Sequence, residues 1–424
     1  MKKLYYLILS IMAVIGLWSV IIRLGEGMKV TALTTYSSWG LWVVLYIFFI
    51  GLSAGSFLLS TMVYVFNMKQ FERVGRIALL SALVSLGAGM LFILIDIGHP
   101  ERFWHTLVYR QGNSVLSWEI HFYLIYLVLM LAELWFLMRE DLNKAAGGTG
   151  IKAAMSKLLA LGYKAPQDAE QLGRHRKSAK KWLKALGIIG IPTAIAVHGG
   201  TGSIFGVVTA KHYWNSGLTP IIFLVSALVS GTALMAFIYA FWSPETDDKD
   251  TLLKKLGSLL ALFISVDLLL VAAEYLIGFY STSPEARLPL MNIVSGDNWY
   301  IFWIGQIALG ALIPLALVAR RNASRRAIGV AGLSVIIGIV AVRWNLIVPA
   351  YDVLPIHGLD KAYFDPRLVN HYVPNTVEWL SSLGLISLAV LIFSVAWEIL
   401  PVIAEEEVQL SYDGQTNEVS TIKA

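Results

Sequence analysis

Stretches of about twenty consecutive apolar residues recur along this chain and alternate with shorter polar connections. The hydrocarbon core of a bilayer is about 30 Å thick, so each stretch is long enough to cross it as a helix. Windows of about nineteen residues predict spans near 4–23, 39–66, 77–97, 118–137, 185–206, 219–242, 256–280, 299–318, 327–349 and 376–403. The pattern therefore predicts an all-α integral membrane protein with about ten transmembrane helices.

The basic residues alternate between the two sets of connections. With a cytoplasmic N-terminus, 24 of the 33 Lys and Arg residues fall in the termini and inner connections, eight in the outer connections, and Arg343 within a span. Cytoplasmic loops of membrane proteins carry such an excess of Lys and Arg. We therefore expect a multi-pass protein of the cytoplasmic (inner) membrane with both termini in the cytoplasm.

Composition narrows the chemistry. The chain is 57% hydrophobic and only 14% charged, and a pI near 9 reflects the basic inner connections rather than nucleic-acid binding. It contains no cysteine, which excludes disulfides and thiolate-ligated iron–sulfur clusters. Any cluster that carries electrons must then belong to a partner. The apolar N-terminal stretch lacks a small-residue cleavage site and is interpreted as an uncleaved first span.

Two short motifs suggest an internal repeat. AGSFLL (54–59) and SGTALM (230–235) share a pattern of small, hydroxyl and apolar residues, and the same offset sets Asp96 against Glu274 and, after the long basic loop, His198 near Arg343. We expect two four-helix bundles repeated in parallel orientation, plus two flanking helices. The predicted units are 1–38 (first span and outer loop), 39–206 (first bundle, with the basic cytoplasmic loop 138–184), 207–349 (second bundle), 350–403 (outer loop and last span) and 404–424 (polar cytoplasmic tail).

Ionisable residues inside the predicted spans are the first functional candidates, because a charge in hydrocarbon is costly. Counting about 1.5 Å per residue from the span ends places Asp96 and Glu119 near the outer surface and Asp267 near the midplane. A proton route toward the inner face would use His198, Asp267, Glu274, Arg343 and Glu133. Two simpler interpretations stay open: Glu133 reaches the inner interface, and Glu274 with Arg343 forms a structural ion pair.

The outer end of the third span carries the most specific motif. DIGHPERFW (96–104) is followed by NSVLSWE (113–119), which opens the next span. The matching positions are Asp96, Gly98, Pro100, Arg102, Phe103, Asn113, Ser114, Ser117 and Trp118. This pattern, together with the GLSAG run at 51–55, resembles the polysulfide-reductase-like (NrfD-type) integral membrane subunits, in their ten-span branch.

The resemblance implies a membrane anchor without a haem or iron–sulfur cluster of its own. Such a subunit docks a ferredoxin-like iron–sulfur protein on its outer face, and beyond it a catalytic subunit, either a molybdopterin enzyme or a hydrogenase. It exchanges electrons with menaquinone or ubiquinone, and some members are thought to move protons. One position departs from the family, because Tyr46 stands where a shorter relative has a quinone-contacting histidine.

Quinone chemistry moves two protons with two electrons, so the ring oxygens need nearby donors and acceptors. The candidate quinone-binding residues are Tyr46, Asp96, His99, Arg102, Trp118, Glu119 and His198. Two other classes stay open. A cytochrome b-type haem anchor would need facing histidines at matched depth, for which the spans offer His121 and His198. A secondary transporter would show broken helices at the midplane.

Overall fold

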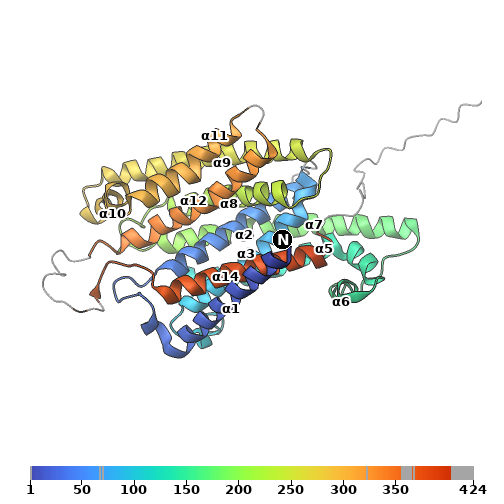
Figure 1. Ribbon diagram of the computed structural model, residues 1–424, viewed down its shortest axis with the longest axis horizontal. Coiled ribbons are helices and arrows are strands. Elements are labelled where there is room, and N and C mark those ends of the chain that lie inside the picture. The colour runs from blue at the N-terminus through green and yellow to red at the C-terminus, as the bar shows by residue number, and fades with distance from the viewer. Residues whose placement is uncertain are drawn as a thin grey trace, which may run out of the picture.

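The computed structural model describes residues 2–65, 68, 71–320, 323–354, 365 and 368–402; the predicted tail, 404–424, lies outside these ranges. Within them there is no β-strand, and ten helices are long and apolar enough to cross a membrane, which confirms the predicted fold class (Figure 1). The crossing helices are α1 (Lys2–Glu26), α2 (Leu41–Val65), α3 (Glu72–Asp96), α5 (Val115–Ala146), α7 (Ala169–Gly206), α8 (Thr219–Phe241), α9 (Lys249–Phe279), η4 with α11 (Ile301–Leu312 and Ile313–Val318), α12 (Arg325–Ile347) and α14 (Thr376–Ile399). The short elements are η1 (Gly27–Val30), η3 (Pro100–Arg102), α4 (His105–Val108), α6 (Gly150–Leu159), α10 (Pro284–Ser295) and η5 (Val348–Ala350).

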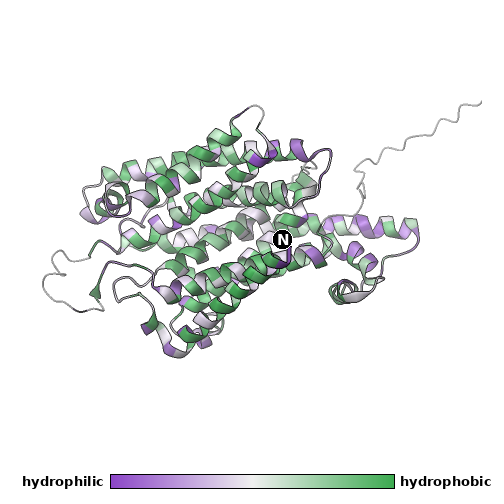
Figure 2. Ribbon diagram, viewed as in Figure 1, coloured by the Kyte–Doolittle hydropathy of each residue, from purple (hydrophilic) through white to green (hydrophobic). Residues whose placement is uncertain are grey.

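The crossing helices run side by side, so the connections gather at two ends (Figure 1). We call the end with residues 97–114, 207–218 and 280–300 the Asp96 end, and the end with residues 147–168 the basic-loop end. Hydrophilic residues concentrate at these ends, most clearly along the first half of α7, which extends past its neighbours (Figure 2). The apolar middle of the bundle matches a bilayer core.

The helix α2 occupies the centre of the molecule. It is apolar on every side, and its membrane-crossing window is completely buried, as expected for a helix without a solvated face. It packs against α3, α7, α8 and α12, whereas the membrane-crossing window of α1 lies largely exposed at the periphery and packs mainly on α14. The central helix therefore contributes one wall to the Glu119 group and to the surroundings of His198, both described below.

The crossing of α2 and α8 depends on two glycines. A Cβ on Gly55 would lie 1.7 Å from the carbonyl oxygen of Ala227, and one on Gly231 would lie 2.1 Å from the carbonyl carbon of Gly55. Small residues permit such close helix approach. The motifs 54–59 and 230–235, noticed for their similarity, thus contact each other at a single crossing. The parallel repeat of two bundles stays a prediction.

The basic segment 138–184 is more helical than the sequence pattern indicates. The helix α5 continues to Ala146, and α7 begins at Ala169, where the carboxylate of Asp168 accepts a hydrogen bond from the backbone N–H of Gln171. A stretch rich in Lys and Arg is hydrophilic, so a hydropathy window predicts that the span ends there. Lys and Arg nevertheless have high helix propensity. The two helices therefore extend past the apolar boundary.

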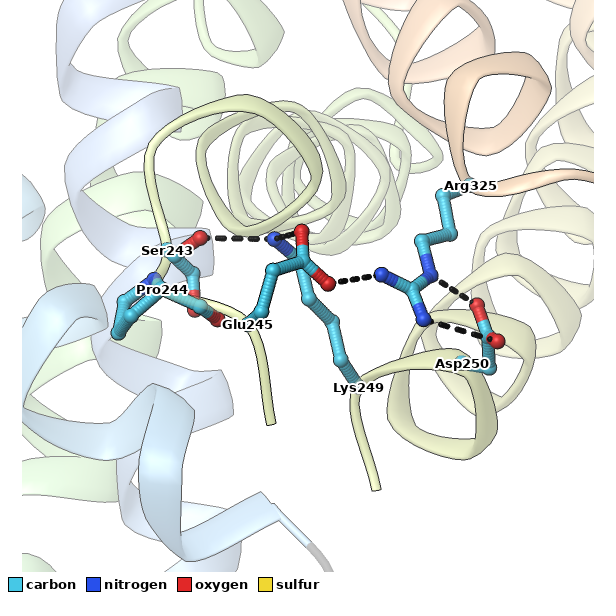
Figure 3. A network of polar contacts seen from close by, with 6 residues as sticks. All are labelled: Ser243, Pro244, Glu245, Lys249, Asp250 and Arg325. Carbon is cyan, nitrogen blue, oxygen red and sulfur yellow. Dashed lines mark hydrogen bonds and ion pairs between the residues drawn. The ribbon is translucent and has the colours of Figure 1, made fainter. Parts of the chain in front are cut away.

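A polar network fastens α12 to the connection between α8 and α9 at the basic-loop end (Figure 3). Arg325 pairs with Glu245 and with Asp250, while Lys249 Nζ donates to the Ser243 carbonyl (2.7 Å) and to Glu245 Oε1 (3.3 Å). Hydrogen bonds from Lys249 and Arg325 hold the pKa of the Glu245 carboxyl below its usual range. The network thus joins two parts of the second predicted bundle that are separated in the chain by η4 and α11.

Candidate functional site

One face of α5 carries a line of buried polar side chains. Glu119, Tyr123, Tyr126 and Glu133 are each 3% exposed or less, and their spacing of four, three and seven residues keeps them on one side of the helix, toward residues of α2 and α7. At about 1.5 Å per residue, the two carboxylates lie about 21 Å apart along the helix. The line therefore covers most of the thickness of a bilayer core.

Glu119 is the centre of the upper part of this line. Its Oε1 accepts hydrogen bonds from the Tyr123 hydroxyl (2.7 Å) and from the hydroxyl of Thr201 on α7. The Tyr46 hydroxyl on α2 lies 2.5 Å from that of Tyr123, and because Tyr123 donates to Glu119, Tyr46 donates to Tyr123. Oε2 of Glu119 is buried without a hydrogen-bond partner. Three helices thus deliver hydroxyl groups to one carboxyl.

The lower part of the line contains Tyr126 and Glu133. The Tyr126 hydroxyl donates to the backbone carbonyl of Ser53 on α2 (3.1 Å). Glu133 Oε1 has no partner, and it faces α7 where Gly187 and Gly190 leave space: added Cβ atoms there would lie 3.9 and 3.6 Å from it. Glu133 is only 1% exposed, so helices and not solvent enclose its carboxyl group. No ion pair of Glu119 or Glu133 occurs within the part of the chain that the structure describes.

His198 lies completely buried on α7 with both ring nitrogens unpartnered. A Cβ on Gly51 of α2 would lie 3.2 Å from its ring, and its other neighbour is Phe223 of α8, at 5.3 Å between ring centroids. The guanidinium of Arg343 from α12 lies 4.5 Å from the centre of the same Phe223 ring. His198 and Arg343, which the predicted repeat aligns as equivalent positions, lie on the same Phe223 ring, His198 through a ring contact and Arg343 through a cation–π contact.

A second polar cluster lies among α8, α9, η4 and α12. Arg343 donates to the Ser226 hydroxyl (2.8 Å), and Asp267 on α9 exerts an attractive electrostatic effect on it. Asp267 Oδ1 is buried without a partner beside a cavity of about 20 Å³, which is room for one water molecule. Gln306 lines the same cavity and accepts a hydrogen bond from Asn345 (2.8 Å).

Glu274 does not join this cluster. Its charge acts on Tyr213 and Tyr275, nearer the Asp96 end of α9. Among the described side chains, Glu274 and Arg343 form no ion pair, so the structural pair considered from the sequence is wrong. Asp267, one helical repeat of seven residues earlier, is the carboxylate that faces Arg343.

The DIGHPERFW motif separates into a buried and an exposed part. Asp96 ends α3, and its Oδ1 is buried without a hydrogen-bond partner. His99 and Arg102 are instead exposed, and Glu101 lies 3.0 Å from the first and 3.7 Å from the second. Trp118 is also largely exposed; its Nε1 donates to the Gly112 carbonyl (2.8 Å). The predicted quinone-binding residues thus fall into three places: Tyr46 and Glu119 in the buried Glu119 group, His198 beside Phe223, and Asp96, His99, Arg102 and Trp118 toward the Asp96 end.

Sequence reasoning missed three buried polar residues. Tyr123 and Thr201 complete the Glu119 group, and the four-residue spacing of Tyr123 from Glu119 on one helix is a signal that was present. Arg23 on α1 is 1% exposed and supplies the attractive charge on Asp96. Nothing in the sequence indicates that Arg23 lies near enough to Asp96 to attract it, because α1 and α3 are distant in the chain.

The buried polar atoms suit a ligand that exchanges protons. Glu119 Oε2, both nitrogens of His198 and Asp96 Oδ1 are acceptors or donors without partners, which is uncommon in native proteins. Among the residues that the structure describes, no three His, Asp or Glu side chains gather as a metal site would require.

Comparisons with known proteins agree with this architecture. Residues 29–355 match the family model described as polysulphide reductase, NrfD. The chain is 57% identical over 421 residues to a selenate reductase subunit of Mesobacillus selenatarsenatis, with 99% of each chain covered. It is 28% identical to a putative dimethyl sulfoxide reductase membrane subunit of Halobacterium salinarum, covering 93% of this chain and 90% of that one. It is 27% identical to the Hdr-like menaquinol oxidoreductase integral membrane subunit of Archaeoglobus fulgidus, covering 95% of this chain and 94% of that one.

Proposed function

Because this chain belongs to the polysulphide reductase NrfD family, we propose that it is the subunit that takes electrons from a membrane quinol and passes them to a docked iron–sulfur subunit of a respiratory reductase. The names of the three relatives support a role in such a complex. Two of them name subunits of reductases, two name membrane subunits, and one names a menaquinol oxidoreductase. Menaquinol is accordingly the proposed donor.

The observation that carries the proposal is the Glu119 group. A quinol that gives up two electrons also releases two protons, which is the chemistry that the bound molecule supplies. Glu119 lies completely inside the helix bundle, holds hydroxyl donors on one oxygen and keeps the other oxygen free. A carboxyl without a counter-ion in such a place suits the uptake and release of a proton more than a structural role.

The remaining polar residues of α5 would carry protons across the bilayer. Tyr126 and Ser53 lie between Glu119 and Glu133, although the spacing leaves gaps that water would have to bridge. His198, Arg343 and Asp267 form a second candidate route in the neighbouring bundle, where the cavity beside Asp267 holds space for one water. Glu274 would extend this second route toward the Asp96 end.

The orientation follows from charge. The basic-loop end carries most of the Lys and Arg residues, which favours the cytoplasm for that end and for both termini. The Asp96 end would then face outward and dock a ferredoxin-like iron–sulfur subunit, with a molybdopterin catalytic subunit beyond it. Exposed Trp and Arg side chains at this end, such as Trp104 and Arg102, are typical interface anchors.

The catalytic subunit is proposed to reduce an oxyanion of the selenate class. This rests on the identity of 57% to a selenate reductase subunit over nearly its full length. The substrate itself would be bound by the catalytic partner, so this chain contributes the electron supply and not the substrate specificity.

Deleting this subunit tests the proposal. In membranes that lack it, menaquinol-driven reduction of the terminal acceptor should disappear, while reduction driven by a soluble dye that feeds the catalytic subunit directly should persist. Undiminished menaquinol-driven activity in those membranes would overturn the proposal.

A further inference from the structure

A cavity of about 840 Å³ opens between α1, α3 and α14 at the Asp96 end. Its polar end is formed by Arg23, His99 and Glu101, and its deeper walls by leucines that include Leu17, Leu91 and Leu388. On α1, Leu17 lies six residues from Arg23, about 9 Å along the helix. The cavity therefore has one polar end near the membrane surface and an apolar interior.

The way in which α1 packs produces this space. The helix α1 approaches α14 so closely that a Cβ on Gly16 would lie 2.2 Å from the Cα of Gly384, and it touches α3 at few points. A wedge is left between α1 and α3. Leu17 and Leu24 on the α1 wall are 43% and 51% exposed, so the wedge opens sideways toward the lipid as well as to the surface.

Arg23 supplies a hydrogen-bond donor inside the cavity. Its side chain is 1% exposed, and its Nη2 donates to the Ile97 carbonyl (2.5 Å). Its Nε is buried without any acceptor. Leaving a buried donor unpaired is unfavourable, so an acceptor supplied by a ligand at this end of the cavity would stabilise the Arg23 side chain.

The charges around the cavity favour a neutral ligand. Arg23 is balanced by Asp96, and the lining adds the carboxylates Glu26 and Glu101. A phosphate-bearing lipid would meet these carboxylates, whereas a neutral ring oxygen needs only one donor. An amphiphile with a small uncharged polar head and a long apolar tail matches both ends of the space.

We infer that this cavity binds an isoprenoid quinone, with a ring oxygen accepting a hydrogen bond from Arg23 Nε and the tail lying along the leucines of α1, α3 and α14. The inference rests on the proposed function and extends it, because it assigns the quinone an access site distinct from the Glu119 group. Arg23 and the α14 wall lie outside residues 29–355, the segment that matches the family model. The site is therefore built with the helices that flank that segment.

A photoactivatable menaquinone analogue tests the site in the purified complex. After illumination, we expect the label on peptides that contain residues 17–27 or 385–388. Leu24→Trp, which fills the wedge from its open side without removing a polar contact, should weaken binding of the analogue about tenfold. Ile21→Trp is the matched control, because Ile21 is exposed on the same helix and does not line the cavity. Arg23→Gln should also weaken binding, and Arg23→Lys should weaken it less.

The outcomes separate this inference from the proposed function. Glu119→Gln should stop menaquinol-driven turnover and leave labelling of α1 unchanged. Labelling confined to α2 and α5, or equal binding by the Leu24→Trp and Ile21→Trp complexes, would overturn the inference and leave the proposed function standing. A third result would also overturn the inference: phosphatidylglycerol displaces the analogue, and the Leu24→Trp complex retains less of that phospholipid than the wild type. The cavity would then be a phospholipid site.

Discussion

Thr201 on α7 and Glu119 on α5 are joined by a hydrogen bond between side chains 82 positions apart in the sequence. The contact holds α7 against α5. At the same level of the bundle, Tyr46 of α2 is linked to Glu119 through the hydroxyl of Tyr123. A polar contact among three helices inside a bilayer is expensive unless each group is satisfied. Here one carboxyl oxygen is satisfied and the other is not, which leaves a position for an exchangeable proton.

Asp96→Asn should lower menaquinol-driven turnover about 100-fold or more, because the amide keeps the shape of the side chain but cannot carry a proton. Copurification of the partner subunits measures assembly, which should be unchanged. Glu285→Gln, which alters an exposed carboxylate at the same end, is the control and should retain turnover. Normal turnover in Asp96→Asn would remove this residue from the mechanism.

Asp267→Asn should reduce proton uptake into vesicles during turnover, since Asp267 is the buried carboxylate nearest to Arg343. A pH-sensitive dye inside the vesicles measures uptake per electron transferred. The control Ser265→Ala changes an exposed hydroxyl on the same helix. An unchanged ratio of protons to electrons in Asp267→Asn would exclude the route through α9.

Gly231→Ala should destabilise the protein by about 1–3 kcal/mol, because the added methyl group would overlap the backbone of Gly55 and force α2 and α8 apart. The thermal unfolding midpoint in detergent measures this. Gly87→Ala is the matched control, since an added Cβ there meets no atom within 4 Å. Equal midpoints for the two variants would show that the crossing tolerates a wider separation.

The network around Glu245 should make stability depend on pH. The folded state holds the pKa of Glu245 below its usual value through Lys249 and Arg325. Its contribution is therefore present above the unfolded pKa of about 4.3 and is lost as the pH falls through the lower folded pKa. The unfolding midpoint of the wild type should approach that of Glu245→Gln as the pH falls from about 5 to about 2. Asp247→Asn in the same connection should leave the wild-type profile unchanged, and a constant gap between wild type and Glu245→Gln would contradict the prediction.

Hydropathy alone predicted the all-helical fold and the ten spans, because a bilayer requires long apolar helices and leaves few alternatives. The same method ended α5 and began α7 at the apolar boundary, since it measures hydrophobicity and not helix formation. The helices in fact continue through basic residues to Ala146 and from Ala169. A hydropathy window therefore cannot detect the polar ends of membrane helices.

The candidate residues were found one at a time, but their partners depend on tertiary structure. Asp96 and Glu119 stand out as carboxylates in apolar spans, whereas the electrostatic influence of Arg23 on Asp96 joins positions 73 residues apart through helices whose packing no local pattern encodes. Which carboxylate of α9 attracts Arg343, Asp267 or Glu274, depends on the depth at which α9 packs against α12. Both carboxylates lie on the same side of α9, so spacing could not distinguish them.

The central claim is that quinol-derived electrons enter through this subunit with Glu119 handling a proton. The most direct test compares Glu119→Gln with the wild-type complex under two electron donors, menaquinol and a soluble dye that bypasses the membrane subunit. The account predicts that the variant complex assembles, keeps dye-driven reduction and loses menaquinol-driven reduction by about 100-fold or more. Menaquinol-driven reduction at the wild-type rate in the Glu119→Gln complex would contradict it.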